Sequence, residues 1–385
     1  MDARESAGNF LSAAADAAFL ERALELAARG VALASPNPMV GAVLVRNGQI
    51  VGQGFHTYDG LRHAEILALE AAGDAARGAT LYINLEPCCH TGRTEPCTRA
   101  LIAAGVARVV AAMPDPNPSV AGRGFKELRA AGLEVRTGLR EAEALRLNEA
   151  FARWMVAKKP LVTLKSALTL DGQLVLPRAK GRAHAAREDR WISSPESRAE
   201  VQRMRHASDA LLTGIGTVLA DNPLLTDRTG LQRRRKLLRV VLDTRLRLPP
   251  RSKLVRSADG DVLVFTRAPE DSPNAHALRR AGVEIVRVGR RGARPDLRRV
   301  IAELARREIL SVLLEAGAGL NSAALDAGLV DKMRVFFAPK VAGFAGIGGA
   351  ATRFPRVQKL HQMTVAQFGP DFAIEGYLHD VYGTR

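Results

Sequence analysis

The sequence is poor in cysteine and has no long apolar run, and both shortages narrow the kinds of protein it encodes. Its 385 residues include only three cysteines, Cys88, Cys89 and Cys97, all within one short stretch. An odd number of clustered cysteines suits a reducing compartment and a metal site better than disulfides. No apolar run approaches the roughly 18 residues of a membrane span, and the N-terminus lacks a basic region followed by an apolar one. We therefore expect a cytoplasmic protein without a membrane partner.

Aromatic residues are also scarce, at 5% of the chain, although the formal net charge is +16. The charge is uneven, because residues 1–157 sum to −1 and residues 158–385 to +17. A basic half could bind nucleic acid, but its basic bursts are not interleaved with aromatic side chains that would stack on bases. Phosphorylated small ligands and solvated surface charge are the simpler explanation, so nucleic acid is disfavoured as a partner. The length predicts two domains, and the sequence is compatible with a homo-oligomer.

The stretch from His63 to Cys97 contains the residues of a catalytic zinc site. His63, Cys88 and Cys97 offer the imidazole and thiolates that zinc prefers, and three protein ligands leave a fourth position for water. Glu65 is the expected proton carrier. Because positions i and i+2 do not share a helix face, His63 and Glu65 both reach the site only if His63 lies at a helix start. His-x-Glu followed by Pro-Cys is typical of zinc deaminases, although here the second cysteine lies nine residues further on.

Cys89 and His90 leave an alternative open. If either completed a shell of four ligands, the site would be closed and purely structural. Glu65 argues against this alternative, because a structural zinc site has no use for an uncoordinated carboxylate.

Periodicity predicts alternating helices and strands in both halves. After a loose tail over 1–15, a helix over 16–30 is expected with Asp16 as its cap, and Asn47-Gly48 predicts a hairpin. One long helix is expected over 139–158, followed by a linker at Lys158-Lys159-Pro160. Further strands are expected at 81–85, 108–113, 133–136, 161–166, 210–213, 239–243, 262–266, 284–288, 311–315 and 332–338. Further helices are expected from His63 to Gly73, from Cys97 onwards, and at 124–131, 195–206 and 296–307. This alternation indicates sheets covered by helices, with ligands at the strand ends.

Several polar and glycine-rich segments lie near the predicted strand ends. Two explanations are open for Asn37 and the run 115–118: these residue types favour turns, or they bind a ligand. Gly214-x-Gly216 is a weak dinucleotide fingerprint. Gly317-Ala318-Gly319 could present backbone N–H groups to a pyrophosphate at a helix start, with a tight turn as the alternative. Glu315 would be costly to bury unpaired, which suggests a ligand beside it.

These motifs resemble a known family. His63-Ala64-Glu65, the Leu-Glu-Pro-Cys run ending at Cys88 and the run 92–97 are similar to the deaminase half of the bifunctional riboflavin-biosynthesis deaminase-reductases, long cysteine spacing included. The resemblance takes in Asn37 and the run 115–118, and it extends over nearly the whole chain. In the second half it rests on Lys165 with 170–172, on 191–195, on Thr217 with 221–223, and on 315–317, all in the family's order.

The resemblance implies an α/β fold with a cytidine-deaminase-like three-layer domain over 16–158 and a dihydrofolate-reductase-like domain over 159–385. The first would remove an amine from 2,5-diamino-6-(5-phosphoribosylamino)pyrimidin-4-one with one Zn²⁺, and the second would reduce the ribosyl to a ribityl chain with NADPH. By motif match, the NADPH residues would be Ala167, Trp191, Thr217, Asp221, Thr244, Gly317, Ala318, Gly319, Leu320, Asn321, Ser322 and Ala323. The substrate residues would be Asn37, Arg93, Asp115, Asn117, Asp189, Arg205, Leu225, Arg228 and Glu315, and the arginines suit a phosphate ester.

One segment departs from the family. Residues 173–190 form a longer and more basic loop than is usual, and Asp189 stands where a substrate-contacting serine is expected. A carboxylate repels a phosphorylated substrate unless Arg187 or Arg190 pairs with it. A nucleic-acid deaminase that uses the basic half for binding and a zinc-stapled interaction module are the two alternatives to the bifunctional enzyme.

Overall fold

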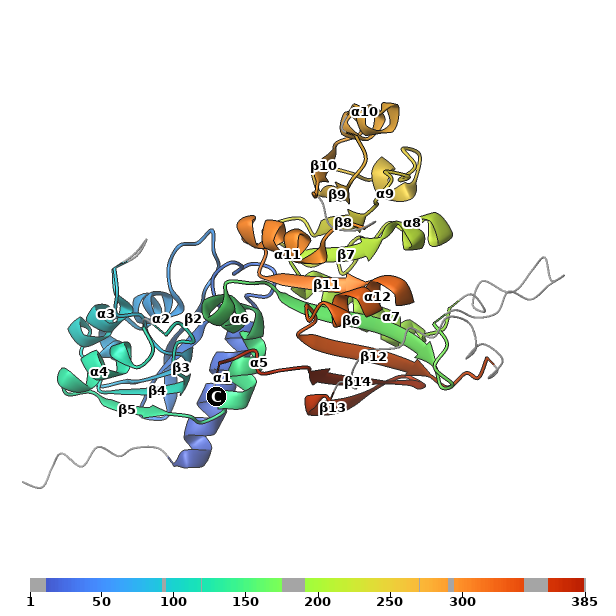
Figure 1. The fold of residues 1–385 in the computed structure, drawn as a ribbon. Helices are drawn as coiled ribbons and strands as arrows, with labels where there is room; N and C mark the ends of the chain where they lie inside the picture. The colour runs from blue at the N-terminus through green and yellow to red at the C-terminus, as the bar shows by residue number, and fades with distance from the viewer. Residues whose placement is uncertain are drawn as a thin grey trace, which may run out of the picture. The chain divides into compact units, whose positions relative to one another are not determined.

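Two separate β-sheets organise the chain, one in each of the units Met1–Val156 and Ala157–Arg385 (Figure 1). The computed structural model describes residues 12–91, 95–118, 120–174, 191–269, 271–289, 294–342 and 359–383. Within these ranges, no helix combines the length and the apolar character that a bilayer crossing requires.

The first unit is a three-layer α/β structure built on a five-stranded sheet (Figure 1). β1 is antiparallel to both of its neighbours, whereas β3, β4 and β5 are parallel, and β3 and β4 are almost fully buried because helices cover both faces. The sheet order is β2 (Gln49–Phe55), β1 (Gly41–Arg46), β3 (Thr80–Leu85), β4 (Arg108–Met113), β5 (Glu134–Thr137). On one face lie α1 (Ala13–Ala28) and α5 (Glu141–Leu147), and on the other α2 (Ala64–Ala72), η1 (Gly73–Ala76), α3 (Cys97–Ala103) and α4 (Arg123–Ala130).

Helix α2 lies directly on strand β2, with backbone against backbone. A Cβ atom at Gly52 would lie 2.1 Å from the Ala68 carbonyl oxygen, and one at Gly54 would lie 2.9 Å from that of Ala64. Neither approach leaves room for a side chain on the strand. The two glycines therefore set the distance of α2 from the sheet.

The first helix differs from the expectation at its start. α1 begins at Ala13 and is capped by Ser12, whose hydroxyl accepts a hydrogen bond from the Ala15 N–H, so residues 13–15 are helical and not part of a tail. Asp16 is therefore not the cap. Its carboxylate is buried inside the first turn and accepts two hydrogen bonds from Arg108, at 2.9 and 2.7 Å, and one from the Tyr82 hydroxyl at 2.7 Å.

The single long helix expected over 139–158 is also wrong. The chain forms α5 and then α6 (Glu149–Ala157), with a break at Asn148. The Asn148 side chain accepts a hydrogen bond from the Met39 N–H and donates one to the Met39 carbonyl. This long-range pairing fixes the residue between the helices and is invisible in the local helical pattern.

The second unit contains a nine-stranded sheet whose strands from β10 to β12 are all parallel (Figure 1). In sheet order these are β10 (Val283–Arg287), β9 (Val262–Thr266), β8 (Leu238–Leu242), β7 (Ala210–Gly214), β11 (Ser311–Glu315), β6 (Leu161–Thr169) and β12 (Lys332–Ala338). The helices are α7 (Pro195–Ala207), α8 (Ile215–Asp221), α9 (Lys253–Arg256), α10 (Pro273–Arg280), α11 (Leu297–Arg306) and α12 (Ala318–Asp326). Each strand expected between 161 and 338 is present.

Sequence reasoning missed the antiparallel end of this sheet. β14 (Asp371–Tyr377) pairs with β12, and β13 (His361–Phe368) pairs with β14 at the edge. Gly369, with φ +60°, forms the turn of this hairpin. Every residue of β13 except Phe368 is exposed, so the strand lacks the apolar alternation on which strand prediction depends.

The buried Asp16–Arg108 pair gives the first prediction. Replacing Asp16 by Ala leaves the guanidinium, with 1% of its side chain exposed, without its main counter-charge, and should destabilise the first unit by about 3–5 kcal/mol. Hydrogen exchange of the β3 and β4 amides, followed during urea denaturation, measures the stability of the first unit independently of the second. Glu25→Ala, at the exposed Arg22–Glu25 pair, is the matched control and should change stability by less than about 1 kcal/mol.

The same pair predicts the direction of the pH dependence. Burial raises the pKa of Asp16, but the hydrogen bonds from Arg108 and Tyr82 outweigh it and leave the pKa below its ordinary value. The contribution of the pair to stability is therefore present above about pH 4 and is lost as the pH falls through the lowered pKa. An equal loss of stability in wild type and Asp16→Ala on acidification would contradict this assignment.

Candidate functional site

Three segments of the first unit bring the predicted zinc ligands together. His63 is the N-cap residue of α2, Cys88 lies in the loop after β3, and Cys97 is the first residue of α3. The requirement that His63 lie at a helix start is thus met, and Glu65 occupies the first turn of the same helix. Among the described residues, His63, Cys88 and Cys97 are the one group of three or more His, Cys, Asp or Glu residues whose possible metal-ligand atoms all lie within 4.8 Å of one another.

The spacing of the donor atoms fits a zinc ion. His63 Nδ1 lies 3.2 Å from Cys97 Sγ and 3.5 Å from Cys88 Sγ. Nitrogen and sulfur ligands around tetrahedral zinc lie about 3.5–3.8 Å apart, so an ion fits after small outward shifts. The hydrogen bond from the Cys97 thiol lowers the pKa of Cys88 and raises that of Cys97.

Glu65 lies beside these ligands in an enclosed position. Its side chain is buried and interacts with both cysteines. Burial, followed by the nearby Cys88 thiolate, raises the pKa of Glu65 to about 7. A carboxyl group with such a pKa can take up and release a proton near neutrality.

Cys89 and His90 do not join the group of three ligands, although both are described. Burial raises the pKa of the Cys89 thiol. The geometry therefore offers three ligands and leaves a fourth position for water, as a catalytic zinc site requires.

Asn37 contacts His56, whose ring packs against that of the zinc ligand His63, and sequence reasoning missed this histidine. The Asn37 amide nitrogen lies 2.9 Å from His56 Nε2, and His56 Nδ1 lies 2.9 Å from the Arg62 carbonyl. The two contacts are compatible if the neutral ring donates from Nδ1 and accepts at Nε2, and burial lowers the pKa of His56 in agreement. The His56 and His63 rings meet edge to face with centroids 5.5 Å apart. The only sequence signal was an unassigned histidine at the end of a predicted strand.

Asp115 and Asn117 lie on a turn after β4 that follows the same edge of the sheet. The Asp115 carboxylate accepts a hydrogen bond from the Asn117 N–H at 2.8 Å. Burial raises the pKa of Asp115 to about 6, and Glu86 and Cys88 add to the rise while His90 opposes it. The Asp115 N–H donates a hydrogen bond of 3.0 Å to Glu86, two residues before Cys88, which places Asp115 near the zinc ligands. Arg93 lies outside the described residues.

A second cluster occupies the carboxyl ends of the parallel strands in the other unit. Glu315, at the end of β11, accepts hydrogen bonds from Arg205 at 2.7 and 3.0 Å, and the Lys165 ammonium of neighbouring β6 lies 3.8 Å away. Burial raises the pKa of Glu315, but the two cations outweigh it and the pKa is lowered. Because Arg205 and Lys165 already pair with Glu315, its burial does not by itself require a ligand, and the contact between Glu315 and the substrate stays a prediction.

The same edge of the sheet carries buried oxygen atoms without hydrogen-bond partners among the described residues. These are the Thr213 hydroxyl, Asn321 Oδ1 and Asp243 Oδ1, of which the last lies 3.8 Å from Arg247 Nε in an ion pair. They lie at the ends of β7 and β8 and in the first turn of α12, and β8, β7 and β11 are adjacent. Buried oxygens of this kind are normally satisfied, so a polar ligand at this edge fits the structure.

Most of the predicted cofactor residues lie on strands or helices that adjoin this edge. Gly317 caps α12 without a side-chain hydrogen bond, and outside the local backbone no atom of the described residues lies within 4 Å of a Cβ placed at Gly317 or Gly319. Exposed backbone N–H groups at this helix start can hold a pyrophosphate. Ala167 lies in β6, Thr217 and Asp221 in α8, Thr244 directly after β8, and residues 318–323 in α12. The exposed Trp191 ring lies 5.2 Å from the Arg198 guanidinium carbon.

The remaining predicted substrate residues are placed unequally. The Leu225 side chain is buried in the core, so only its backbone can meet a ligand. Arg228 is exposed, whereas the Arg205 guanidinium is occupied by Glu315 and by the Thr226 carbonyl. Asp189, Arg187 and Arg190 lie outside the described residues.

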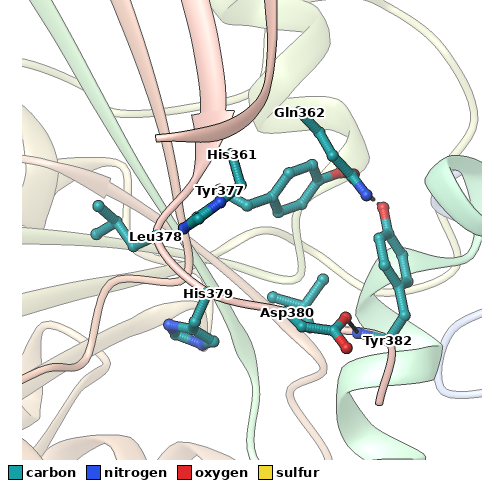
Figure 2. Close-up of a pocket in the computed structure, with 8 residues that line it drawn as sticks. His361, Gln362, Tyr377, Leu378, His379, Asp380 and Tyr382 are labelled. Carbon is teal, nitrogen blue, oxygen red and sulfur yellow. Dashed lines mark hydrogen bonds between the residues drawn. The ribbon is translucent and has the colours of Figure 1, made fainter. Parts of the chain in front are cut away.

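Figure 2 shows a separate hollow at the antiparallel end of the sheet, where Tyr377 and Tyr382 share a hydrogen bond of 2.8 Å between their hydroxyls. Its walls also include His361, Gln362 and Leu378. None of the predicted site residues lines it. The hollow is therefore not where the catalytic chemistry is expected.

Comparison with known families agrees with the two sites. Residues 13–113 match the profile described as the cytidine and deoxycytidylate deaminase zinc-binding region, and residues 160–374 match the RibD C-terminal domain. The chain is 41% identical over 379 residues to the riboflavin biosynthesis protein RibD of Escherichia coli K12, covering 93% of this chain and 98% of that protein. It is also 41% identical to RibD of Synechocystis, with coverage of 94% and 96%.

Solved structures show the same likeness. A structure of Acinetobacter baumannii RibD superposes with a TM-score of 0.79 at 36% identity, covering 94% of this chain and 99% of that one. A Thermotoga maritima protein, described as a diaminohydroxyphosphoribosylaminopyrimidine deaminase/5-amino-6-(5-phosphoribosylamino)uracil reductase, superposes with a TM-score of 0.76 at 35% identity and the same coverage.

Metal analysis tests the ligand set. The purified chain should contain one zinc ion, and Cys88→Ala or Cys97→Ala should remove it, because two ligands hold zinc weakly. Cys89→Ser is the matched control and should retain the metal. Cobalt substitution should give the absorption of a tetrahedral site with thiolate ligands. Loss of zinc in Cys89→Ser would mean that the ligands have been misassigned.

Proposed function

Because this chain belongs to the family of bifunctional RibD deaminase-reductases of riboflavin biosynthesis, we propose that its two units catalyse successive steps on one phosphorylated pyrimidine. The first unit deaminates 2,5-diamino-6-(5-phosphoribosylamino)pyrimidin-4-one, and the second reduces the ribosyl group of the product to a ribityl chain. The family membership and the convergence of His63, Cys88 and Cys97 support this assignment. We propose that the two domains divide between residues 158 and 159, and that the first begins with α1 at Ala13 instead of at residue 16.

In the deaminase, His63, Cys88 and Cys97 would hold a zinc ion, which would supply an activated water for attack on the ring carbon that bears the amine. Glu65 would take up a proton from the water and pass it to the amine, which would leave as ammonia while the oxygen of the water replaces it on the ring. The carboxylate is suited to both transfers because burial brings its pKa to about 7. The enclosed position also limits proton exchange with bulk water.

Four polar residues of the first unit are proposed to hold the substrate. His56 binds the amide nitrogen of Asn37 and so directs the Asn37 carbonyl oxygen elsewhere, where it can accept from the pyrimidine. Asp115 and Asn117 approach from the turn after β4, and Arg93 is assigned to the phosphate by motif match.

In the reductase, NADPH is the proposed hydride donor to C1 of the ribose. The start of α12 at Gly317 to Ala323, the partnerless Asn321 oxygen and the open space at Gly317 and Gly319 support a pyrophosphate site there. Ala167, Trp191, Thr217, Asp221 and Thr244 are assigned to the rest of the cofactor.

The Lys165–Glu315–Arg205 cluster is proposed to face the ribose. Burial lowers the pKa of Lys165, and Glu315 opposes this effect. Arg205 fixes the Glu315 carboxylate through two hydrogen bonds and so orients it towards the substrate. Arg228, with its exposed side chain, is the better candidate for the phosphate. The backbone of Leu225 and Asp189 are assigned to the substrate by motif match alone. A cytoplasmic location suits the free cysteines of the zinc site.

The assignment of Glu65 predicts a selective loss of activity. Glu65→Gln should lower the kcat of ammonia release by about 10²–10⁴-fold, because an amide cannot carry the proton. Zinc content should stay at one per chain. NADPH oxidation with the deaminated intermediate should be unchanged, which controls for folding, and ammonia release at the wild-type rate would sink the role proposed for Glu65.

The cofactor site gives a further prediction. Gly317→Ala should fold normally, because φ is −77° and its Cβ would meet no atom within 4 Å. The added methyl group occupies the space proposed for the pyrophosphate and should weaken NADPH binding about tenfold, measured by cofactor fluorescence. Asp326→Asn, at the other end of α12, is the control. Unchanged affinity in Gly317→Ala would place the pyrophosphate elsewhere.

A further inference from the structure

Glu86 is a buried carboxylate between the end of β3 and the zinc ligand Cys88. Each of its oxygens accepts two backbone hydrogen bonds. Oε2 accepts from the N–H groups of Asp115 at 3.0 Å and Gly122 at 2.8 Å, and Oε1 accepts from those of Gly124 at 2.8 Å and Phe125 at 3.3 Å. Four backbone donors on one side chain satisfy a buried negative charge without a cation.

The two oxygens join different parts of one segment. Because Oε2 binds both Asp115 and Gly122, it closes the chain between them into a loop over Glu86. Oε1 binds the first-turn N–H groups of α4, which begins at Arg123, and so caps that helix. The turn over 115–118 and the start of α4 are thereby fixed to the residue two positions before Cys88.

Close backbone packing reinforces this connection. A Cβ atom at Gly124 would lie 2.2 Å from the Pro87 carbonyl oxygen and 3.1 Å from Glu86 Oε1. Glycine at this position lets the start of α4 lie against the zinc-ligand segment. On the other side of that segment, the Cys88 carbonyl accepts a hydrogen bond from the Thr98 N–H of α3 at 3.2 Å. The Pro87–Cys88 segment is thus held between α3 and α4.

We propose that Glu86 is a positioning residue of the deaminase, which holds the turn carrying Asp115 and Asn117 at a fixed distance from the zinc ligands. Substrate binding, rather than metal binding or proton transfer, then depends on it. The inference rests on the proposed function in one respect, because Asp115 and Asn117 must contact the substrate. A helix cap alone requires only the bonds from Gly122, Gly124 and Phe125 at the start of α4, whereas the bond from the Asp115 N–H reaches the turn.

The test is Glu86→Gln in the full chain with zinc bound. A glutamine oxygen can replace one carboxylate oxygen, but its NH₂ group then faces two backbone N–H donors and cannot accept from them. We expect the deaminase KM to rise about tenfold or more while kcat changes less than about threefold. Zinc should remain at one per chain, and reductase activity on the deaminated intermediate should match wild type.

A double-mutant cycle distinguishes positioning from general structure. If Glu86 acts through the turn, Glu86→Gln should add little to the KM of an Asn117→Ala chain, so the two effects are non-additive. Gly124→Ala moves the start of α4 away from Pro87 while keeping the carboxylate, and should also raise KM without zinc loss. Glu127→Gln, on the same helix and outside the four hydrogen bonds, is the matched control and should leave KM unchanged.

Three results would overturn the proposal. These are an unchanged KM in Glu86→Gln, loss of zinc or of folding in the first unit, and additive effects in the cycle with Asn117→Ala. Failure of the proposed function has a different signature, because wild-type protein with zinc would then release no ammonia from the pyrimidine.

Discussion

The deaminase site depends on how closely α2 can approach the sheet. Gly52 and Gly54 leave no side chain at two points where β2 meets the backbone of α2, and Ala64 and Ala68 present small groups from the helix. The start of α2 is therefore set by backbone contact, and with it the positions of His63 and Glu65. A zinc site tolerates errors of only a few tenths of an ångström in its ligands, so rigid backbone packing is a suitable support.

The second ligand segment is supported by hydrogen bonds instead. Cys88 lies in a loop, and loops are ordinarily more mobile than the helices around them. Here Glu86 ties the start of that loop to α4 and to the turn at Asp115, and the Thr98 N–H binds the Cys88 carbonyl. A packed helix start and a loop held by hydrogen bonds thus bring side chains from distant parts of the sequence into one metal site.

The contrast between local and distant interactions explains what the sequence could predict. The zinc ligands, the hairpin at Asn47-Gly48 and most strands follow from local patterns, and the structure confirms them. Asp16 was taken for a helix cap because its true partner, Arg108, lies 92 residues away. The helix break at Asn148 depends on a hydrogen bond with Met39, 109 positions away, and Glu315 pairs with Arg205, 110 positions away. Glu86 likewise accepts a hydrogen bond from Asp115, 29 positions away. Such side-chain pairings leave no periodic signal.

The basic excess of the second unit has a partly structural explanation. Arg233 donates hydrogen bonds to the carbonyls of residues 205, 206, 208 and 235, and buried Arg239 to those of Leu224 and Ser257 as well as to Asp261. Arg298 donates to the Ala327 carbonyl at the end of α12. A guanidinium has five donors and favours helix C-termini, where carbonyls lack partners and the helix dipole is negative. Arg233 and Arg239 also pair with Asp227 and Asp261, so bonding to carbonyls gives these arginines a structural use but explains only part of the uncompensated charge.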